Sequence, residues 1–433
     1  MRHELVVEGL IANPERIFEA QLGIDDGLIS EMKRQGLRGE RTLDARGCLI
    51  FPGFIDLHVH LREDSSHQWD YKEDFRTGTT AALHGGVTTV VDMPNTPVPG
   101  ITADRIRAKK ALARAQGLID ILFYGGVANS NVTALGDLQS EVAAFKLFLT
   151  TMGELQLDET TLPDALRAVE STSRPATIHC EDPRIIAERA AGLKSAWRER
   201  ARQPELYSRL RPEDAELSAV RSVLAAATAV PRLHINIAHV SVHETVELIK
   251  QHPTVHGEIT PHHLFFSKDD AAAKQAFLKM NPPLRTEENR QRLIAALKAG
   301  EIDFLATDHA PHTREEKSQE FADAPAGVPQ LDTYGNFVAW LMTHCELHPT
   351  LIARICASNP AHFLGLVDRG RIDVGKRAHL TILDLQKRTR IRSDQLYTKC
   401  GWSPFEGYEF PGTVKHTIYN GLVMTDYDDI LAT

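Results

Sequence analysis

The stretch FIDLHVH, at residues 54–60, is a short apolar run of the kind that forms a buried strand. Seven similar runs, rich in Val, Ile, Thr and Phe, follow it: TTVVDMP (88–94), IDILFYGGV (119–127), AAFKLFL (143–149), ATIHC (176–180), HINIAHV (234–240), TVHGEIT (254–260) and IDFLATDHA (302–310). The intervening segments include four amphipathic stretches, at 102–117, 161–174, 241–253 and 286–301. Strands that alternate with helices over about residues 50–365 predict an α/β fold, the (β/α)8 or TIM-type barrel.

A doubly wound open sheet is the alternative for the same alternation. It would need a glycine-rich phosphate loop after an early strand, and the sequence contains none. Local signals also place two helix starts, with Thr286 as one N-cap and Ser241 with Glu244 as a capping box. The alanine-rich stretch 213–230 is expected to be a core helix.

The two ends of the chain have a different pattern, with short alternating runs and turn residues. Asp25-Asp26-Gly27 and Asn420-Gly421 are flanked by apolar residues, which is a hairpin signal. Each end alone is too short for a core. We therefore expect residues 1–50 and 370–433 to form one small composite β-sandwich domain beside a catalytic barrel of residues 51–369.

Composition excludes several classes of protein. The 433 residues include 42% hydrophobic and 25% charged residues, which are ordinary values for a soluble globular chain. The net charge of −9, without a basic stripe, argues against nucleic-acid binding. Five scattered cysteines with no CxxC motif favour a reducing compartment. Without a signal peptide or a run of about 18 apolar residues, the expected location is the cytoplasm and no membrane contact is expected.

Histidines and an aspartate stand at the ends of several predicted strands. His58 and His60 are two residues apart, so their side chains share one face at the end of the first strand. With 20 histidines in the chain, one HxH pattern is expected by chance, and its position gives it weight. His179, His239 and Asp308 end the fifth, sixth and eighth runs. Barrel enzymes build their sites at these carboxyl ends of the strands.

Lys146 lies inside the fourth apolar run, between Phe145 and Leu147. A lysine in a buried strand is costly unless it is paired, neutralised or modified. Imidazole and carboxylate ligands without cysteine suit Zn²⁺, with Mn²⁺, Co²⁺ or Fe²⁺ as alternatives. Two such ions could make a nucleophilic hydroxide and polarise a carbonyl group.

Together these motifs resemble the dihydroorotase family, cyclic amidohydrolases of the amidohydrolase superfamily. The resemblance covers nearly the whole chain and rests on PGFIDLHVHLRE (52–63), MPNT (93–96), AFKLFL (144–149), IHCED (178–182), AHVS (238–241), PHHL (261–264), MNPPLR (280–285), ATDHAPH (306–312), NPAHFLGL (359–366), GRIDVGKRAHLTILD (370–384) and SPFEGYEFPGTV (403–414). The segment EDSSHQWDYKEDF (63–75) departs from the family, which usually has a short Glu-Pro-Gly turn before its Lys-Glu. Gln330-Leu331-Asp332 replaces the usual Gly-Leu-Glu.

The resemblance implies two zinc ions per chain, bridged by Lys146 after carbamylation with CO₂. His58 and His60 would hold one ion, and His179 and His239 the other. Asp308 would be the last metal ligand and also the general base and acid.

The resemblance also implies that Arg62, Asn95 and His312 bind the substrate carboxylate and that Asn281 holds the ring amide. Arg62 would share the face of His60 if the strand continues. A purely structural role is the alternative for three of these residues. Arg62 could pair with Glu63 at the surface, Asn95 could form a turn before Pro97, and His312 could cap a helix.

The activity implied is the reversible cyclisation of N-carbamoyl-L-aspartate to L-dihydroorotate in de novo pyrimidine biosynthesis, through a metal-bridging hydroxide. The expected partner is this small substrate, and family analogy predicts a homodimer. Dihydropyrimidinase, hydantoinase or allantoinase activity is one alternative. A non-catalytic homologue is the other, although such a chain would be expected to have lost ligands.

Overall fold

The computed structural model describes residues 2–150, 152–199 and 203–424. Its centre is an eight-stranded parallel sheet in which each strand pairs with its neighbour in the sequence. The strands are β5 (Phe54–Val59), β6 (Val87–Asp92), β7 (Asp120–Gly126), β8 (Ala144–Leu149), β9 (Ala176–Cys180), β10 (Ile235–Ile237), β11 (Val255–Ile259) and β12 (Phe304–Leu305). A parallel bridge between Val59 and His309 joins the last strand region to the first. The barrel prediction is therefore confirmed.

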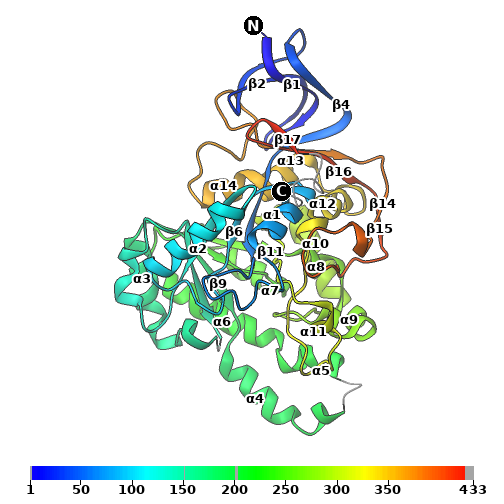
Figure 1. Ribbon diagram of the computed structural model, residues 1–433. Helices are drawn as coiled ribbons and strands as arrows, with labels where there is room; N and C mark the ends of the chain where they lie inside the picture. The colour runs from blue at the N-terminus through cyan, green and yellow to red at the C-terminus, as the bar shows by residue number, and fades with distance from the viewer. Residues whose placement is uncertain (1, 151, 200–202, 425–433) are drawn as a thin grey trace.

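Helices surround the barrel strands (Figure 1). They are α1 (Phe75–His84), α2 (Ala103–Gln116), α3 (Leu162–Ser171), α4 (Pro183–Leu193), α5 (Gln203–Leu210), α6 (Glu213–Ala227), α7 (His243–Ile249), α8 (Pro261–Phe265), α9 (Lys268–Lys274), α10 (Glu287–Lys298), α11 (Arg314–Lys317), α12 (Tyr334–Thr343), α13 (Pro349–Ala353) and α14 (Asn359–Phe363). In Figure 1, α4 and α5 lie at the end of the molecule opposite the terminal strands β1 (Arg2–Ala12) and β2 (Ile17–Asp25). Within the described residues, no helix combines the length and apolar character needed to cross a membrane.

The two predicted helix starts had different outcomes. Thr286 caps α10 as predicted, because its side chain accepts a hydrogen bond from the backbone N–H of Asn289. The capping box at Ser241 was wrong, because α7 begins one residue later and Val242 is its N-cap without a side-chain bond. The hydroxyl of Ser241 donates instead to Glu216, a buried carboxylate of α6.

Both ends of the chain build one seven-stranded sheet, in the order β17-β16-β13-β4-β1-β2-β3. The remaining strands of this sheet are β3 (Leu28–Lys33), β4 (Arg38–Pro52), β13 (Leu380–Asp384), β16 (Thr413–Tyr419) and β17 (Leu422–Met424). Strand β4 joins the two ends, because residues 38–50 pair with β1 while residues 49–52 pair with β13. Both ends contribute side chains to one apolar core, among them Val7, Ile50 and Leu380.

The predicted hairpins are also confirmed. Asp26 and Gly27 connect β2 to β3, and Asn420 and Gly421 connect β16 to β17. All four residues have positive φ angles, of 49°, 73°, 47° and 77°. Asp, Asn and Gly tolerate this backbone region, which explains their use at these turns. A further two-stranded ribbon, β14 (Thr389–Arg390) with β15 (Glu409–Phe410), precedes β16.

Candidate metal centre

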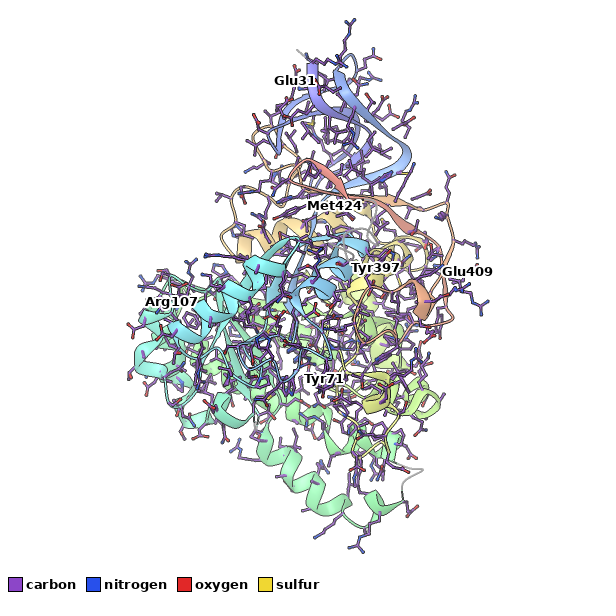
Figure 2. All side chains as sticks on the ribbon, viewed as in Figure 1. Glu31, Tyr71, Arg107, Tyr397, Glu409 and Met424 are labelled. Atoms are coloured by element: carbon purple, nitrogen blue, oxygen red, sulfur yellow. The ribbon has the colours of Figure 1, made fainter. Side chains whose placement is uncertain are left out.

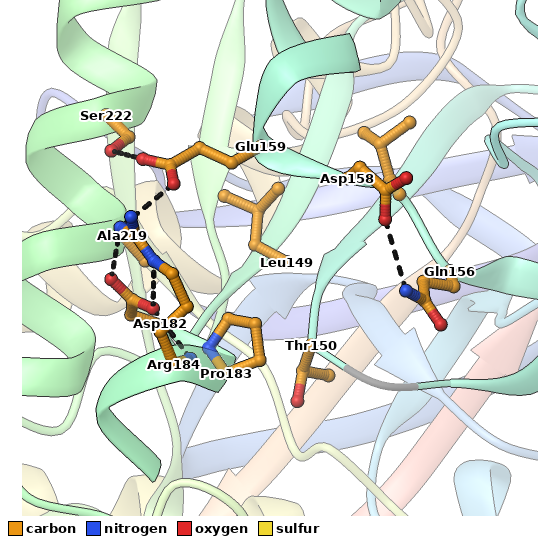
Figure 3. A pocket seen from close by; sticks show the side chains of 11 residues that line it. Leu149, Thr150, Gln156, Asp158, Glu159, Asp182, Pro183, Arg184, Ala219 and Ser222 are labelled. Atoms are coloured by element: carbon orange, nitrogen blue, oxygen red, sulfur yellow. Dashed lines mark hydrogen bonds and ion pairs between the residues drawn. The ribbon is translucent and has the colours of Figure 1, made fainter. Parts of the chain in front are cut away.

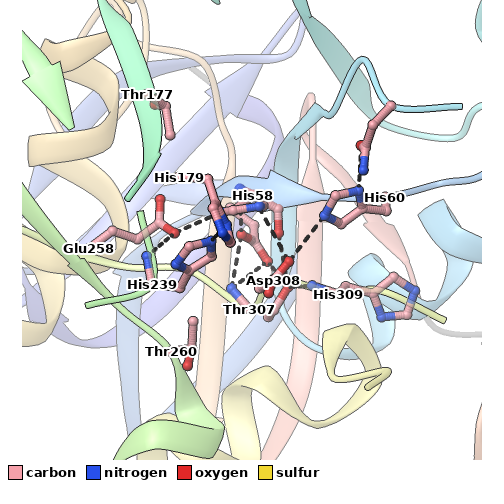
Figure 4. A network of polar contacts seen from close by, with 12 residues as sticks. His58, His60, Thr177, His179, His239, Glu258, Thr260, Thr307, Asp308 and His309 are labelled. Carbon is pink, nitrogen blue, oxygen red and sulfur yellow. Dashed lines mark hydrogen bonds and ion pairs between the residues drawn. The ribbon is translucent and has the colours of Figure 1, made fainter. Parts of the chain in front are cut away.

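Three predicted ligands from the first and last barrel strands meet at the carboxyl ends of those strands (Figure 4). Metal-binding atoms of His58, His60 and Asp308 all lie within 4.8 Å of one another. The Oδ1 atom of Asp308 is 3.1 Å from Nε2 of His60 and 3.3 Å from Nε2 of His58. Three such donors around one point form a geometry that suits a divalent ion.

His179 and His239, from the ends of β9 and β10, form the second half of this cluster. The Nδ1 atom of His179 lies 2.9 Å from Nε2 of His239. The rings of His239 and His58 are 5.4 Å apart between centroids, so the two halves are in contact. The Nδ1 atom of His239 is buried and makes no hydrogen bond within the described structure.

Lys146 is fully buried on β8 and lines one cavity together with these four histidines and Asp308. Its Nζ atom has no hydrogen-bond partner among the described residues, and the ring of Phe148 lies 5.2 Å away. Burial lowers the pKa of Lys146 to about 8. A buried amine without an acceptor is the kind of group that a metal-bridging modification would satisfy.

A buried carboxylate orients the first histidine of the cluster. Glu258 on β11 accepts a hydrogen bond from Nδ1 of His58 at 2.8 Å, which turns Nε2 toward Asp308. The other oxygen of Glu258 accepts from Asn236 at 2.7 Å. The backbone N–H of His239 also donates to Glu258, at 3.0 Å. Carboxylates that hold the outer nitrogen of a histidine are typical of metal sites.

Two more acceptors perform the same task. Nδ1 of His60 donates to Oδ1 of Asn95 at 2.9 Å. Nε2 of His179 donates to Glu181 at 2.9 Å, and Arg211 donates to the same carboxylate. Three of the four histidines therefore direct one fixed nitrogen into the cluster.

The electrostatics keep these groups in the protonation states of metal ligands. Burial lowers the pKa of His60 to about 3 and holds that of His239 well below its usual value. Burial would raise the pKa of Asp308, but His58 and His60 hold it well below the usual range. Neutral imidazoles and an ionised carboxylate are the forms that bind cations.

Three residues around the cluster have left-handed backbone conformations. Their φ angles are 63° for Arg62, 38° for His239 and 48° for Asp308. Such angles cost about 1–3 kcal/mol each outside glycine and gather at functional sites. The condition under which Arg62 would share a strand face with His60 is not met, because β5 ends at Val59. The left-handed turn nevertheless brings Arg62 into the cavity.

One cavity of about 290 Å³ is lined by every predicted metal ligand and substrate contact. The predicted metal ligands and substrate contacts that line it are His58, His60, Arg62, Asn95, Lys146, His179, His239, Asn281, Asp308 and His312. The simpler structural roles considered for Arg62 and His312 do not hold. Glu63 bonds the backbone of Phe75 and the side chain of Gln116. The N-cap of α11 is Thr313 and not His312.

Comparison with known proteins now identifies the family. A sequence profile described as "Amidohydrolase family" matches residues 49–424. The chain belongs to the amidohydrolase family.

Named relatives of this amidohydrolase cover almost its whole length. It is 34% identical over 417 residues to a protein of Methanothermobacter thermautotrophicus, covering 95% of this chain and 92% of the relative. It is 35% identical over 421 residues to a protein of Halobacterium salinarum, covering 94% and 96% of the two chains. Both relatives are named dihydroorotase. Among solved structures it resembles the L-hydantoinase (dihydropyrimidinase) of Arthrobacter aurescens, with a TM-score of 0.92, 26% identity and coverage of 97% and 96%.

Sequence reasoning missed several polar residues of this amidohydrolase site. Glu258 lies within the run TVHGEIT, and a charged residue inside a buried strand is the same signal that marked Lys146. Arg211 lines the cavity between α5 and α6 and had no such signal, because it lies in a polar segment. His262 and His263 are buried but bond Gln330 and Thr260, and neither lines the cavity.

A second cavity, of about 200 Å³, lies beside the carboxyl ends of β8 and β9 (Figure 3). Arg184 pairs with both Glu159 and Asp182 at 2.9 Å, and Asp158 accepts from Gln156. Ser222 donates to Glu159 as well. None of the predicted site residues lines this cavity, and these charged groups already satisfy one another.

Proposed function

We propose that this amidohydrolase is a dihydroorotase, which interconverts N-carbamoyl-L-aspartate and L-dihydroorotate in de novo pyrimidine biosynthesis. The observation that carries the proposal is Arg62. It is 6% exposed, lines the cavity of the histidine cluster and donates through Nε to the carbonyl of Pro311 at 3.2 Å. The guanidinium also lies 3.3 Å from Nε2 of His312 and 5.7 Å from the ring of Trp69, and none of these three neighbours is a carboxylate. A buried cation in a substrate cavity is suited to a carboxylate on the ring, which uncharged cyclic amides lack.

We infer that two divalent ions, by ligand type zinc, complete the cluster. His58 and His60 would hold one ion, His179 and His239 the other, and Asp308 would be a further ligand. Lys146 would bridge them as a carbamate, formed when its neutral amine attacks CO₂ and loses a proton. The partnerless buried Nζ atom supports this assignment. When bound, the ions would polarise the amide carbonyl and lower the pKa of a water molecule.

The side chains of this chain would supply positioning and proton transfer. Asp308 takes the proton of the attacking water and delivers it to the departing amide nitrogen, and the same carboxylate serves in the reverse direction. Arg62, His312 and Asn95 would hold the carboxylate. The Oδ1 atom of Asn95 accepts from His60, which leaves its Nδ2 group as the donor for substrate.

Asn281 would bind the ring amide through its Nδ2 group. The phenol of Tyr207 donates to Oδ1 of Asn281 at 2.5 Å, and this bond fixes the orientation of the amide. Tyr207 is itself buried on α5. Asn281 therefore presents hydrogen-bond donors, and the ring carbonyl oxygens are the matching acceptors.

The decisive experiment is hydrolysis of dihydroorotate by purified protein, with metal content measured on the same preparation. Dihydrouracil, hydantoin and allantoin are assayed in parallel, because the resemblance to a hydantoinase favours an uncharged ring as the second candidate. A large preference for one of these rings would refute the proposal. A preparation with well under one metal ion per chain and no turnover would favour the non-catalytic homologue.

We also propose a cytoplasmic homodimer that binds neither nucleic acid nor membrane. Light scattering of the purified protein tests the dimer, and a monomer mass would contradict it.

For the domain organisation we propose a barrel of residues 51–369 and a composite β-domain of residues 1–50 and 370–433, whose outermost residues lie outside the described structure. Limited proteolysis that releases the terminal sheet as one unit would support this division.

A further inference from the structure

The segment after β5 places a buried lysine against His312. Lys72 is 6% exposed, and its Nζ atom is 2.8 Å from Oε1 of Glu316 and 3.2 Å from Nδ1 of His312. The rings of Trp69 and Tyr71 lie over the same ammonium, at 5.1 and 5.5 Å. Tyr71 is labelled in Figure 2, on the barrel and away from the terminal sheet. Burial lowers the pKa of Lys72, and the ion pair with Glu316 and the two ring faces oppose this by favouring the cation.

The contacts of His312 define its tautomer. An ammonium can only donate, so Nδ1 of His312 must accept from Lys72. The Nε2 atom is 3.1 Å from the carbonyl oxygen of Ala326, which can only accept. Both contacts are satisfied when Nε2 carries the proton and Nδ1 does not, and neither is satisfied in the other neutral tautomer. Burial and the charges of Arg62 and Lys72 hold the pKa of His312 well below its usual value, so the ring is neutral.

In this tautomer the contact between His312 and Arg62 is not a hydrogen bond. Nη2 of Arg62 lies 3.3 Å from Nε2 of His312, and both atoms are then donors. Two donors at this distance do not bond each other. Both residues line the cavity, so a carboxylate oxygen placed beside them can accept from Arg62 and can share the single Nε2–H of His312 with the carbonyl of Ala326.

We propose that Lys72 is a positioning residue that fixes His312 as the neutral Nε2–H tautomer, so that His312 and Arg62 donate together to the substrate carboxylate. The identity of that carboxylate rests on the proposed function. The assignment of the tautomer does not, because it depends only on contacts within the chain.

The same geometry predicts the effect of replacing Lys72. The Oε2 atom of Glu316 lies 3.6 Å from Nδ1 of His312. In Lys72→Met this carboxylate becomes the nearest partner of Nδ1 and draws the proton there. An imidazolium is disfavoured beside Arg62, so Nε2 loses its proton and accepts from the guanidinium instead. The unprotonated Nε2 of His312 then repels the substrate carboxylate. Arg62 donates to His312 and no longer to the substrate.

The first test reads the tautomer directly, in metal-loaded protein with ¹⁵N-labelled histidines and without substrate. The two ring nitrogens are assigned in a ¹H–¹⁵N correlation by the signals that disappear in His312→Gln. We expect a protonated Nε2 in the wild type and in Lys72→Arg, because arginine also only donates. We expect a protonated Nδ1 in Lys72→Met. A protonated Nδ1 in the wild type, or an unchanged ring in Lys72→Met, would overturn the proposal.

The second test separates binding from turnover with dihydroorotate. Lys72→Met should raise KM about tenfold with kcat within about twofold, since a hydrogen bond to a charged group is lost. The KM of Lys72→Arg should lie between those of the wild type and Lys72→Met. The matched control is Lys274→Met, which also removes an ammonium that lies over two rings, those of Phe266 and Tyr408. A fall in kcat at unchanged KM in Lys72→Met, or the same KM rise in Lys274→Met, would refute the positioning role. Absent turnover by the wild type would refute the proposed function while the tautomer stays measurable.

Discussion

Glu258 and His58 are 200 positions apart in the sequence and share a hydrogen bond of 2.8 Å at the centre of the barrel. The carboxylate is fully buried and lies on β11, whereas His58 lies on β5, the first barrel strand. His58 directs its other nitrogen to Asp308. The bond thus links a residue that would hold a metal to one that would not.

The first prediction concerns this bond. Glu258→Gln should lower metal affinity about 10- to 100-fold, because the amide orients His58 without the negative charge that makes it a better ligand. Competition with a chelator, followed by metal analysis, measures the effect. Asp332→Asn is the matched control, since Asp332 is also buried and accepts from a histidine, His84, but does not line the cavity. Equal metal affinity in both variants would contradict the assignment.

The second prediction concerns proton transfer. Asp308→Ala should retain metal through the histidines and Lys146 but lower kcat by about 10²–10⁴-fold, the usual contribution of a general acid or base. Steady-state hydrolysis of dihydroorotate and metal content on one preparation measure both properties. Near-normal turnover would rule out the proton-transfer role. Asp303→Asn, outside the cavity, should keep its turnover.

The third prediction concerns specificity. Arg62→Met should lower kcat/KM for dihydroorotate about 100-fold, because a charged substrate group is left without its partner in a buried site. Weak activity on dihydrouracil should change little, so the ratio of the two values is the measurement. Arg105→Met serves as control, because Arg105 binds Pro99 and Glu154 and does not line the cavity. A parallel loss of both activities in Arg62→Met would show a structural effect.

The fourth prediction concerns acid stability of the terminal sheet. Hydrogen bonds from Ser30 and His3 lower the pKa of Asp25 to about 2. The unfolded chain therefore binds more protons than the folded chain between about pH 4 and 2, so the stabilisation is present above this window and lost as the pH falls through it. Asp25→Asn should lower the free energy of unfolding at pH 7 by about 1 kcal/mol, a value limited by solvent screening.

Urea unfolding at pH 7, 5, 4 and 3 would measure the difference between the wild type and Asp25→Asn. The difference should shrink toward the acid end of the series. Asp26→Asn is the control, because Asp26 is exposed and its positive φ of 49° is one that asparagine tolerates. A difference for Asp25→Asn that stays constant with pH would contradict the role of the ionised carboxylate.

Much of this arrangement could be predicted from local patterns. Short apolar runs located the barrel strands, and polar residues at their ends located the cluster, because parallel strands present their carboxyl ends at one face. Lys146 was visible because a cation inside an apolar run has few structural explanations. The turns at Gly27 and Gly421 were visible because their backbone geometry selects few residue types.

The parts that could not be predicted depend on contacts between distant segments. Ser241 had the sequence of a capping box, but buried Glu216 offered its hydroxyl a stronger acceptor. The position of Arg62 depends on its left-handed backbone conformation, which the sequence does not predict for an arginine. Lys72 lies in a polar segment that follows the unusual turn, and only the fold brings it beside His312.

Strand β4 has a consequence for the order in which the molecule can be assembled during synthesis. Its last residues pair with β13, and the backbone N–H of Gly53, just before the first barrel strand, donates to His379 at 2.7 Å. Strand β4 therefore waits for a partner that is translated more than 300 residues later, as the register Pro52↔Leu380 requires. Until then the edge of β4 that pairs with β13 has no strand beside it, and an unpaired strand edge is prone to association with other chains.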